Sequence, residues 1–109
     1  MNDVGESFNR IAEVIESRKS GIHENSYVAQ FFSKGQDEIL RKVLEESTEV
    51  LLASKSGKEE NVIAEIADLW FHLLVLLSFH DLKLHDILEE LKSREGISGI
   101  EEKQSRKLD

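Results

Sequence analysis

Apolar residues recur along the first part of this chain with the period of an α-helix. A first helix is predicted by apolar positions three and four residues apart, namely Phe8, Ile11, Ala12 and Ile15. Ser7 precedes them and suits the N-cap of that helix. The polar segment 18–25 predicts a loop. After it, Ser26 opens a short apolar run that fits a helix or a strand and ends at Gly35.

The second part of the chain has longer periodic segments. A third helix is predicted over 36–54, with Gly57 placed to stop it. A fourth covers about 61–80, preceded by Glu59 and Glu60, which suit the positive end of a helix dipole. A fifth covers about 84–94 and stops before Gly96. The pattern therefore predicts an all-α chain of about five helices.

Composition agrees with one small helical domain. The chain has 109 residues, no proline and no cysteine. Without proline the main helix breaker is missing, and without cysteine neither disulfides nor thiolate chemistry are available. We expect a single domain over 1–109, with a core at about 7–96 and a charged, flexible tail at 97–109.

The charge and the hydropathy pattern exclude several classes of partner. A net charge of −8 argues against nucleic-acid binding. The longest apolar stretch is about 11 residues, short of the ~20 that a bilayer requires. No signal-peptide pattern is visible at the N-terminus. We expect a soluble cytoplasmic protein, which would need a bound divalent cation to hold a phosphorylated ligand.

Two groups of carboxylates, one on the predicted third helix and one on the predicted fourth helix, are the candidate functional residues. Glu45, Glu46 and Glu49 form the pattern EExxE, and Glu65 with Asp68 forms ExxD. At about 100° per residue, Glu46 falls inside the apolar arc of the third helix and Glu49 at its margin, whereas Glu45 points further toward solvent. A buried, unbalanced carboxylate is costly, so Glu46 is the anomaly.

On the fourth helix Glu65, Asp68 and His72 share one polar stripe. The rest of its circumference is apolar, which in so small a protein predicts an antiparallel bundle that a partner chain completes. If the two helices pack together, the pairs Glu46/Glu49 and Glu65/Asp68 face each other and repel unless a cation balances them. Oxygen ligands favour Mg²⁺, with Mn²⁺ as an alternative. His72 fits a core or supporting role better than that of a ligand.

The carboxylates of the third helix also have an ordinary interpretation. Arg41 with Glu45 and Lys42 with Glu46 are i, i+4 pairs, so EExxE could be a solvated, salt-bridged helix face. Lys42 is at the same time a candidate phosphate contact.

Longer motifs resemble a known family. They are SYVA at 26–29, KG at 34–35, KVLEE at 42–46, EV at 49–50, EIADLWFHLLVLL at 65–77 and ILEEL at 87–91. Together they resemble phosphoribosyl-ATP pyrophosphatases, which belong to the all-α, MazG-type nucleotide pyrophosphohydrolases. The resemblance covers about residues 7 to 96.

The resemblance implies the second step of histidine biosynthesis: hydrolysis of phosphoribosyl-ATP to phosphoribosyl-AMP and pyrophosphate by a homodimer. It implies that Glu46, Glu49, Glu65 and Asp68 hold Mg²⁺. Catalysis would rest on Glu45 and Glu46, and Lys42, Ser26 and Tyr27 would contact substrate.

Two alternatives to this activity stay open. One is a house-cleaning pyrophosphatase of non-standard nucleoside triphosphates, which would use the same acids. The other is a non-catalytic helical dimerisation module. A di-iron carboxylate bundle is discounted, because its Glu-x-x-His motif is absent.

Overall fold

The computed structural model describes residues 3–19 and 26–107, and these ranges contain six helices and no strand. The helices are α1 (Val4–Arg18), α2 (Tyr27–Lys34), α3 (Gln36–Ser56), α4 (Glu59–Phe79), α5 (Leu84–Ser93) and α6 (Gly99–Lys107). The all-α prediction is confirmed, and the strand alternative after Ser26 is wrong. The expected number of helices is one too small, because α6 forms in the segment expected to be a tail. The flexibility of that tail stays a prediction.

The helix ends follow from individual side chains. Asp3, and not Ser7, is the N-cap of α1, because its carboxylate accepts a hydrogen bond from the backbone N–H of Glu6 at 3.2 Å. Ser26 caps α2 as predicted, accepting from the N–H of Ala29 at 3.3 Å. Gly57 ends α3 with φ of 76°, a left-handed conformation that glycine adopts without steric cost. The loop predicted at 18–25 lies outside the described residues, apart from Arg18 and Lys19.

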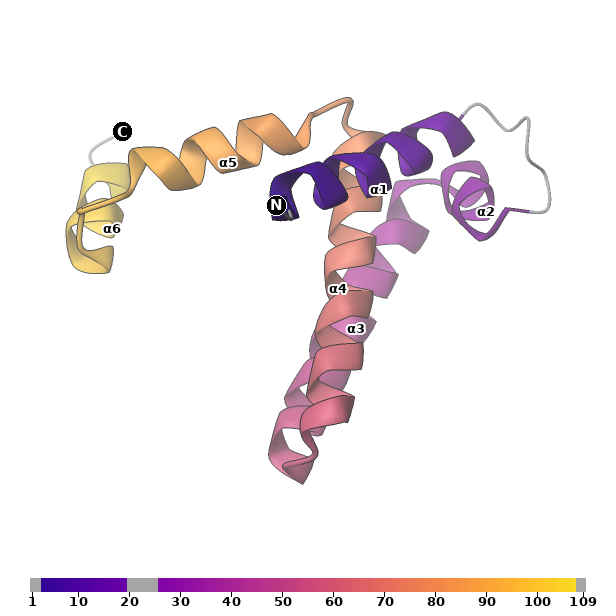
Figure 1. Cartoon of the computed structure of the whole chain (residues 1–109), viewed down its shortest axis with the longest axis horizontal. Coiled ribbons are helices and arrows are strands. Elements are labelled where there is room, and N and C mark those ends of the chain that lie inside the picture. The colour runs from indigo at the N-terminus through magenta and orange to yellow at the C-terminus, as the bar shows by residue number, and fades with distance from the viewer. Residues whose placement is uncertain (1–2, 20–25, 108–109) are drawn as a thin grey trace.

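Helices α3 and α4 form a long antiparallel hairpin, and α1 and α2 lie across one end of it (Figure 1). The connection between the two long helices is short, which holds them side by side in opposite directions. The buried core lies where the four helices meet and consists of Ile15, Val28, Phe31, Ile39, Leu74 and Val75. One face of α3 is thereby fixed against one face of α4.

Lys19 ties the end of α1 to the end of α4. Its ammonium group donates to the backbone carbonyl of Ser78 at 2.5 Å and to the carboxylate of Asp81. Ser78 in turn donates through its hydroxyl to Glu16 at 2.6 Å. Asp81 has a left-handed backbone, with φ of 59°, at the turn that leads toward α5.

A large part of α4 is not covered by the chain itself. Ile63, Trp70 and Leu73 are exposed, although α4 is the most apolar of the helices. By length and composition alone α4 could cross a membrane, a condition that the core helix of a soluble protein also meets. The apolar stretch of about 11 residues that was compared above with the ~20 needed to span a bilayer covers only part of this 21-residue helix. Helix α5 extends away from the hairpin and carries α6 at its far end (Figure 1).

Candidate metal centre

Three carboxylates from α3 and α4 meet on the facing sides of the hairpin. One oxygen each of Glu46, Glu65 and Asp68 lies within 4.8 Å of the other two. We call these three residues the acidic cluster. Glu46 is buried, Glu65 half-buried and Asp68 exposed, so the cluster is open to solvent on one side. This geometry allows one small cation to contact all three side chains.

The helical projection located the buried member of the cluster correctly. Glu46 is only 9% exposed, as predicted from its position inside the apolar arc of α3. Glu49, predicted to be the fourth ligand, is exposed and is not part of the acidic cluster. Its charge is nevertheless near enough to contribute to the raised pKa of Glu65. The structure therefore brings three of the four predicted ligands together and leaves the fourth at the edge.

Crowding of like charges is visible at Glu65. Partial burial raises the pKa of its carboxyl above the ordinary value, and the carboxylates of Asp68, Glu46 and Glu49 raise it further. A cation bound between these groups would remove the repulsion and favour the ionised form. The cluster thus carries excess negative charge of the kind that a hard divalent cation neutralises.

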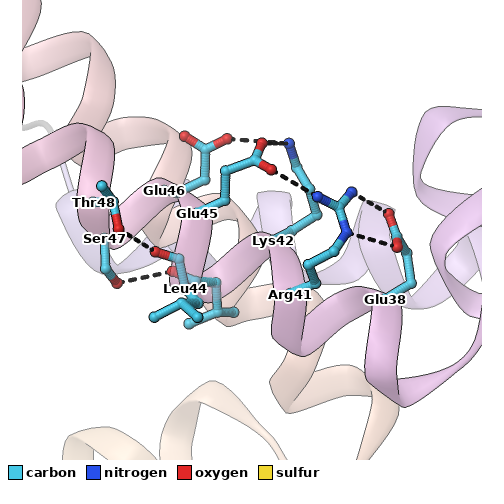
Figure 2. A network of polar contacts seen from close by, with 9 residues as sticks. Glu38, Arg41, Lys42, Leu44, Glu45, Glu46, Ser47 and Thr48 are labelled. Atoms are coloured by element: carbon cyan, nitrogen blue, oxygen red, sulfur yellow. Dashed lines mark hydrogen bonds and ion pairs between the residues drawn. The ribbon is translucent and has the colours of Figure 1, made fainter.

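A ladder of ion pairs runs along α3 beside the acidic cluster (Figure 2). The ammonium of Lys42 lies 2.7 Å from Glu45 and 3.4 Å from Glu46. The guanidinium of Arg41 donates to Glu45 at 2.7 Å and holds both oxygens of Glu38 at 3.0 and 2.7 Å. Each carboxylate oxygen of Glu45 therefore accepts a hydrogen bond from a cationic side chain. Lys42 contributes most to the lowered pKa of Glu45, and Arg41 lowers it further.

The ladder confirms the ion pairs that were predicted within EExxE, whereas metal binding by EExxE stays a prediction. Glu45 and Arg41 form the salt-bridged helix face that i, i+4 spacing predicts. Glu46, one residue further, turns inward to the acidic cluster. Lys42 joins the two, since its side chain is mostly covered and contacts both carboxylates. Glu38 was not singled out from the sequence, although its position three residues before Arg41 was a usable signal.

The residues of the SYVA motif lie at the start of α2. Tyr27 is half-exposed, and its hydroxyl is near enough to Lys42 to act on the pKa of that ammonium. Ser26 serves as the N-cap of α2. Tyr27 thus lies near the ladder. Ser26 caps α2, and this structural role accounts for a serine at that position.

A surface hollow of the molecule lies away from the acidic cluster. A cavity of about 530 Å³ lies between α1, the end of α4 and the start of α5, lined among others by Glu16, Leu74, Ser78, Asp81 and Leu84. None of the predicted site residues lines it. Two of the carboxylates that line it, Glu16 and Asp81, are already held by Lys19. The acidic cluster is therefore the better candidate for chemistry.

Comparison with known proteins assigns the chain to a family. The family model described as phosphoribosyl-ATP pyrophosphohydrolase matches residues 8–95, a span that includes the acidic cluster and the ladder. The chain belongs to the phosphoribosyl-ATP pyrophosphohydrolase family. The family resemblance inferred from the motifs is confirmed, and so is the prediction that the chain is a hydrolase.

Similar proteins of this family come from several bacteria, and each of the following is named phosphoribosyl-ATP pyrophosphatase. The protein of Nitrosospira multiformis is 58% identical over 98 residues, 90% of this chain and 81% of the relative. That of Chromobacterium violaceum is 50% identical over 97 residues, 89% of this chain and 90% of the relative. That of Burkholderia vietnamiensis is 53% identical over 102 residues, 90% of this chain and 84% of the relative.

Proposed function

We propose that this protein hydrolyses phosphoribosyl-ATP to phosphoribosyl-AMP and pyrophosphate, using Mg²⁺ held between α3 and α4. The reaction follows from membership of the phosphoribosyl-ATP pyrophosphohydrolase family. The observation that carries the site is the convergence of Glu46, Glu65 and Asp68 within 4.8 Å. The mutual repulsion at Glu65 supports a bound cation there.

The donor set fits Mg²⁺ and accommodates Mn²⁺. All members of the acidic cluster offer carboxylate oxygens, the ligand type that both cations prefer. Glu49 lies at the edge, within reach as a fourth ligand if its side chain turns inward. When bound, the cation would neutralise charge on the triphosphate and help to polarise the bond that breaks.

Lys42 and Glu45 have complementary tasks in this proposal. Lys42 carries the positive charge nearest to the acidic cluster, at 3.4 Å from Glu46, and would contact a phosphate oxygen of the substrate. Glu45 holds Lys42 and Arg41, and each of its oxygens keeps a second lone pair that can accept a hydrogen bond from the attacking water. The lowered pKa of Glu45 makes orientation of that water a better role for it than proton abstraction.

The start of α2 supplies the remaining proposed contacts. The exposed ring of Tyr27 lies beside Lys42, where a nucleotide bound to the cation would extend. The hydroxyl of Ser26 accepts a backbone hydrogen bond and still has a proton to donate to substrate. Both residues are proposed substrate contacts.

We also propose that the protein is a homodimer in the cytoplasm. Its accessible surface is 8249 Å² for a mass of 12.5 kDa, whereas a compact monomer of this mass exposes about 6,200 Å². Its radius of gyration is 16.1 Å, against about 13 Å for a compact chain of this length. An excess of about 2,000 Å² per chain matches the area that obligate dimers bury.

A second copy is the partner that these surfaces fit. Helix α3 also exposes several leucines, and α5 presents Ile87, Leu88 and Leu91 on one side. The protein should remain in the supernatant after ultracentrifugation of a cell lysate if a second copy, and not lipid, covers α4.

The test of the activity is pyrophosphate release from phosphoribosyl-ATP, with and without Mg²⁺, beside a panel of nucleoside triphosphates. We expect Mg²⁺-dependent release that strongly favours phosphoribosyl-ATP. Glu65→Gln should abolish it, while Glu89→Gln on the exposed surface of α5 serves as the matched control. Preference for plain triphosphates would instead support a house-cleaning enzyme, and no turnover of any substrate would leave a dimerisation module.

A further inference from the structure

His72 is a buried polar residue that the proposed reaction does not yet use. It projects from α4 one turn after Asp68 and is only 3% exposed. Aromatic rings enclose it: Phe31 and Phe71 lie edge to face at 5.1 and 5.2 Å, and Tyr27 lies at 6.2 Å. An isosteric apolar residue would fill this position without leaving a polar group unsatisfied. The imidazole therefore requires an explanation.

One ring nitrogen of His72 has no partner. Nδ1 is fully enclosed and makes no hydrogen bond, and it is the only side-chain nitrogen or oxygen in this condition within residues 3–19 and 26–107. An unsatisfied buried donor or acceptor destabilises the fold. This loss of stability is tolerable if the other ring nitrogen of His72 makes a hydrogen bond that the function requires.

Charged groups of the site lie near enough to His72 to act on its ring. Lys42, Glu46 and Glu45 on α3 and Asp68 on α4 all act on it electrostatically, and Tyr27 packs against it from α2. Burial is the main reason that the pKa of His72 is lowered, followed by the nearby Lys42. A neutral imidazole carries one proton, on either ring nitrogen. A hydrogen bond to a carboxylate is roughly twice as strong as a neutral one. A contact between an N–H and an aromatic face is weaker still.

We propose that His72 is a positioning residue for the metal-binding carboxylates. Its neutral ring carries the proton on Nε2 and donates it, directly or through one water molecule, to Glu46 or Asp68 when the acidic cluster holds a cation. The carboxylate is thereby fixed with its other lone pairs toward the metal, as hydrogen-bond partners of metal ligands commonly do. This inference rests on the proposed metal centre and extends it to a residue outside the ligand set.

Three substitutions separate positioning from packing. His72→Phe keeps the ring volume among the aromatic neighbours and removes both nitrogens. His72→Gln places an amide near the position of Nε2, whereas the shorter His72→Asn reaches only the position of Nδ1. His85→Phe, on the exposed start of α5, is the control for an unrelated histidine. Mg²⁺ affinity is measured by calorimetry, and thermal stability is measured without metal.

We expect His72→Phe to weaken Mg²⁺ binding by roughly 10- to 100-fold while the metal-free melting temperature stays equal or rises. Glutamine should restore affinity close to that of the wild type, and asparagine should not. Long-range ¹H–¹⁵N spectra should show the proton of His72 on Nε2. Unchanged Mg²⁺ affinity in His72→Phe, or rescue by asparagine and not glutamine, would overturn the inference and leave the metal centre intact. A wild-type protein that binds no Mg²⁺, or binds it equally well after Glu65→Gln, would refute the metal centre together with the inference.

Discussion

Replacing Trp70 with glutamate should separate the proposed homodimer into monomers. Trp70 lies on the uncovered face of α4 and is 50% exposed in the single chain. The covered part of the indole packs against Phe8, with ring centroids 5.1 Å apart. The exposed part is the largest apolar side-chain surface on this face, so we expect it to lie against the second copy.

The magnitude follows from the area that Trp70 offers. A buried tryptophan covers roughly 150–250 Å², so the exposed half contributes about 100 Å². At about 25 cal/mol per Å² its burial is worth about 2.5 kcal/mol, and a symmetric dimer buries it twice. Loss of about 5 kcal/mol raises the dissociation constant by a factor of roughly 10³–10⁴. A buried glutamate adds a desolvation cost, so this is a lower bound.

Sedimentation equilibrium over a range of protein concentrations is the assay. The wild type should sediment with twice the mass of 12.5 kDa, and Trp70→Glu with the mass of the single chain. Trp70→Phe is the matched control, since it keeps an aromatic ring on the same face and should remain dimeric. A wild type that sediments as a monomer would refute the argument from surface area, as would a glutamate variant as tightly dimeric as the phenylalanine variant.

Three further predictions concern the metal centre, the ion pair between Lys19 and Asp81, and the core. Mg²⁺ at a hundred times its dissociation constant should stabilise the wild type by about 2.7 kcal/mol in urea unfolding. It should leave Glu65→Gln unchanged, and equal stabilisation of both would place the cation elsewhere. The hydrogen bond from Lys19 lowers the pKa of Asp81 below its ordinary 3.8. The ion pair therefore stabilises the fold fully above pH 3.8, and this stabilisation is lost as the pH falls through the lowered pKa of Asp81. Acid titration followed by circular dichroism should show a smaller loss for Asp81→Asn, and identical curves would count against the pair. Ile39 is fully buried, so Ile39→Ala should lower the free energy of unfolding by about 2–5 kcal/mol; a urea midpoint unchanged from the wild type would contradict its place in the core.

Local patterns in the sequence were sufficient for the helices and for several of their ends. The spacing of apolar residues predicted α3 and α4, and Ser26 and Gly57 marked a start and a stop correctly, because caps and left-handed ends depend on single residues. The start of α1 was missed by about one turn. Val4 lies four residues before Phe8 and continues the apolar period, and Asp3 supplies the cap before it. Helix α6 has few apolar residues, so periodicity did not reveal it.

For the site, the sequence by itself determined that Glu46 points inward and that Glu65, Asp68 and His72 share a stripe, since position on a helix is fixed by the residue count. Only the tertiary structure decided which carboxylates meet. The register of α3 against α4 joins Glu46 with Glu65 and Asp68 and leaves Glu49 at the margin. The same packing encloses Nδ1 of His72 among aromatic rings from α2 and α4. These distances depend on how two helices pack across a hairpin, and no period within either helix contains that information.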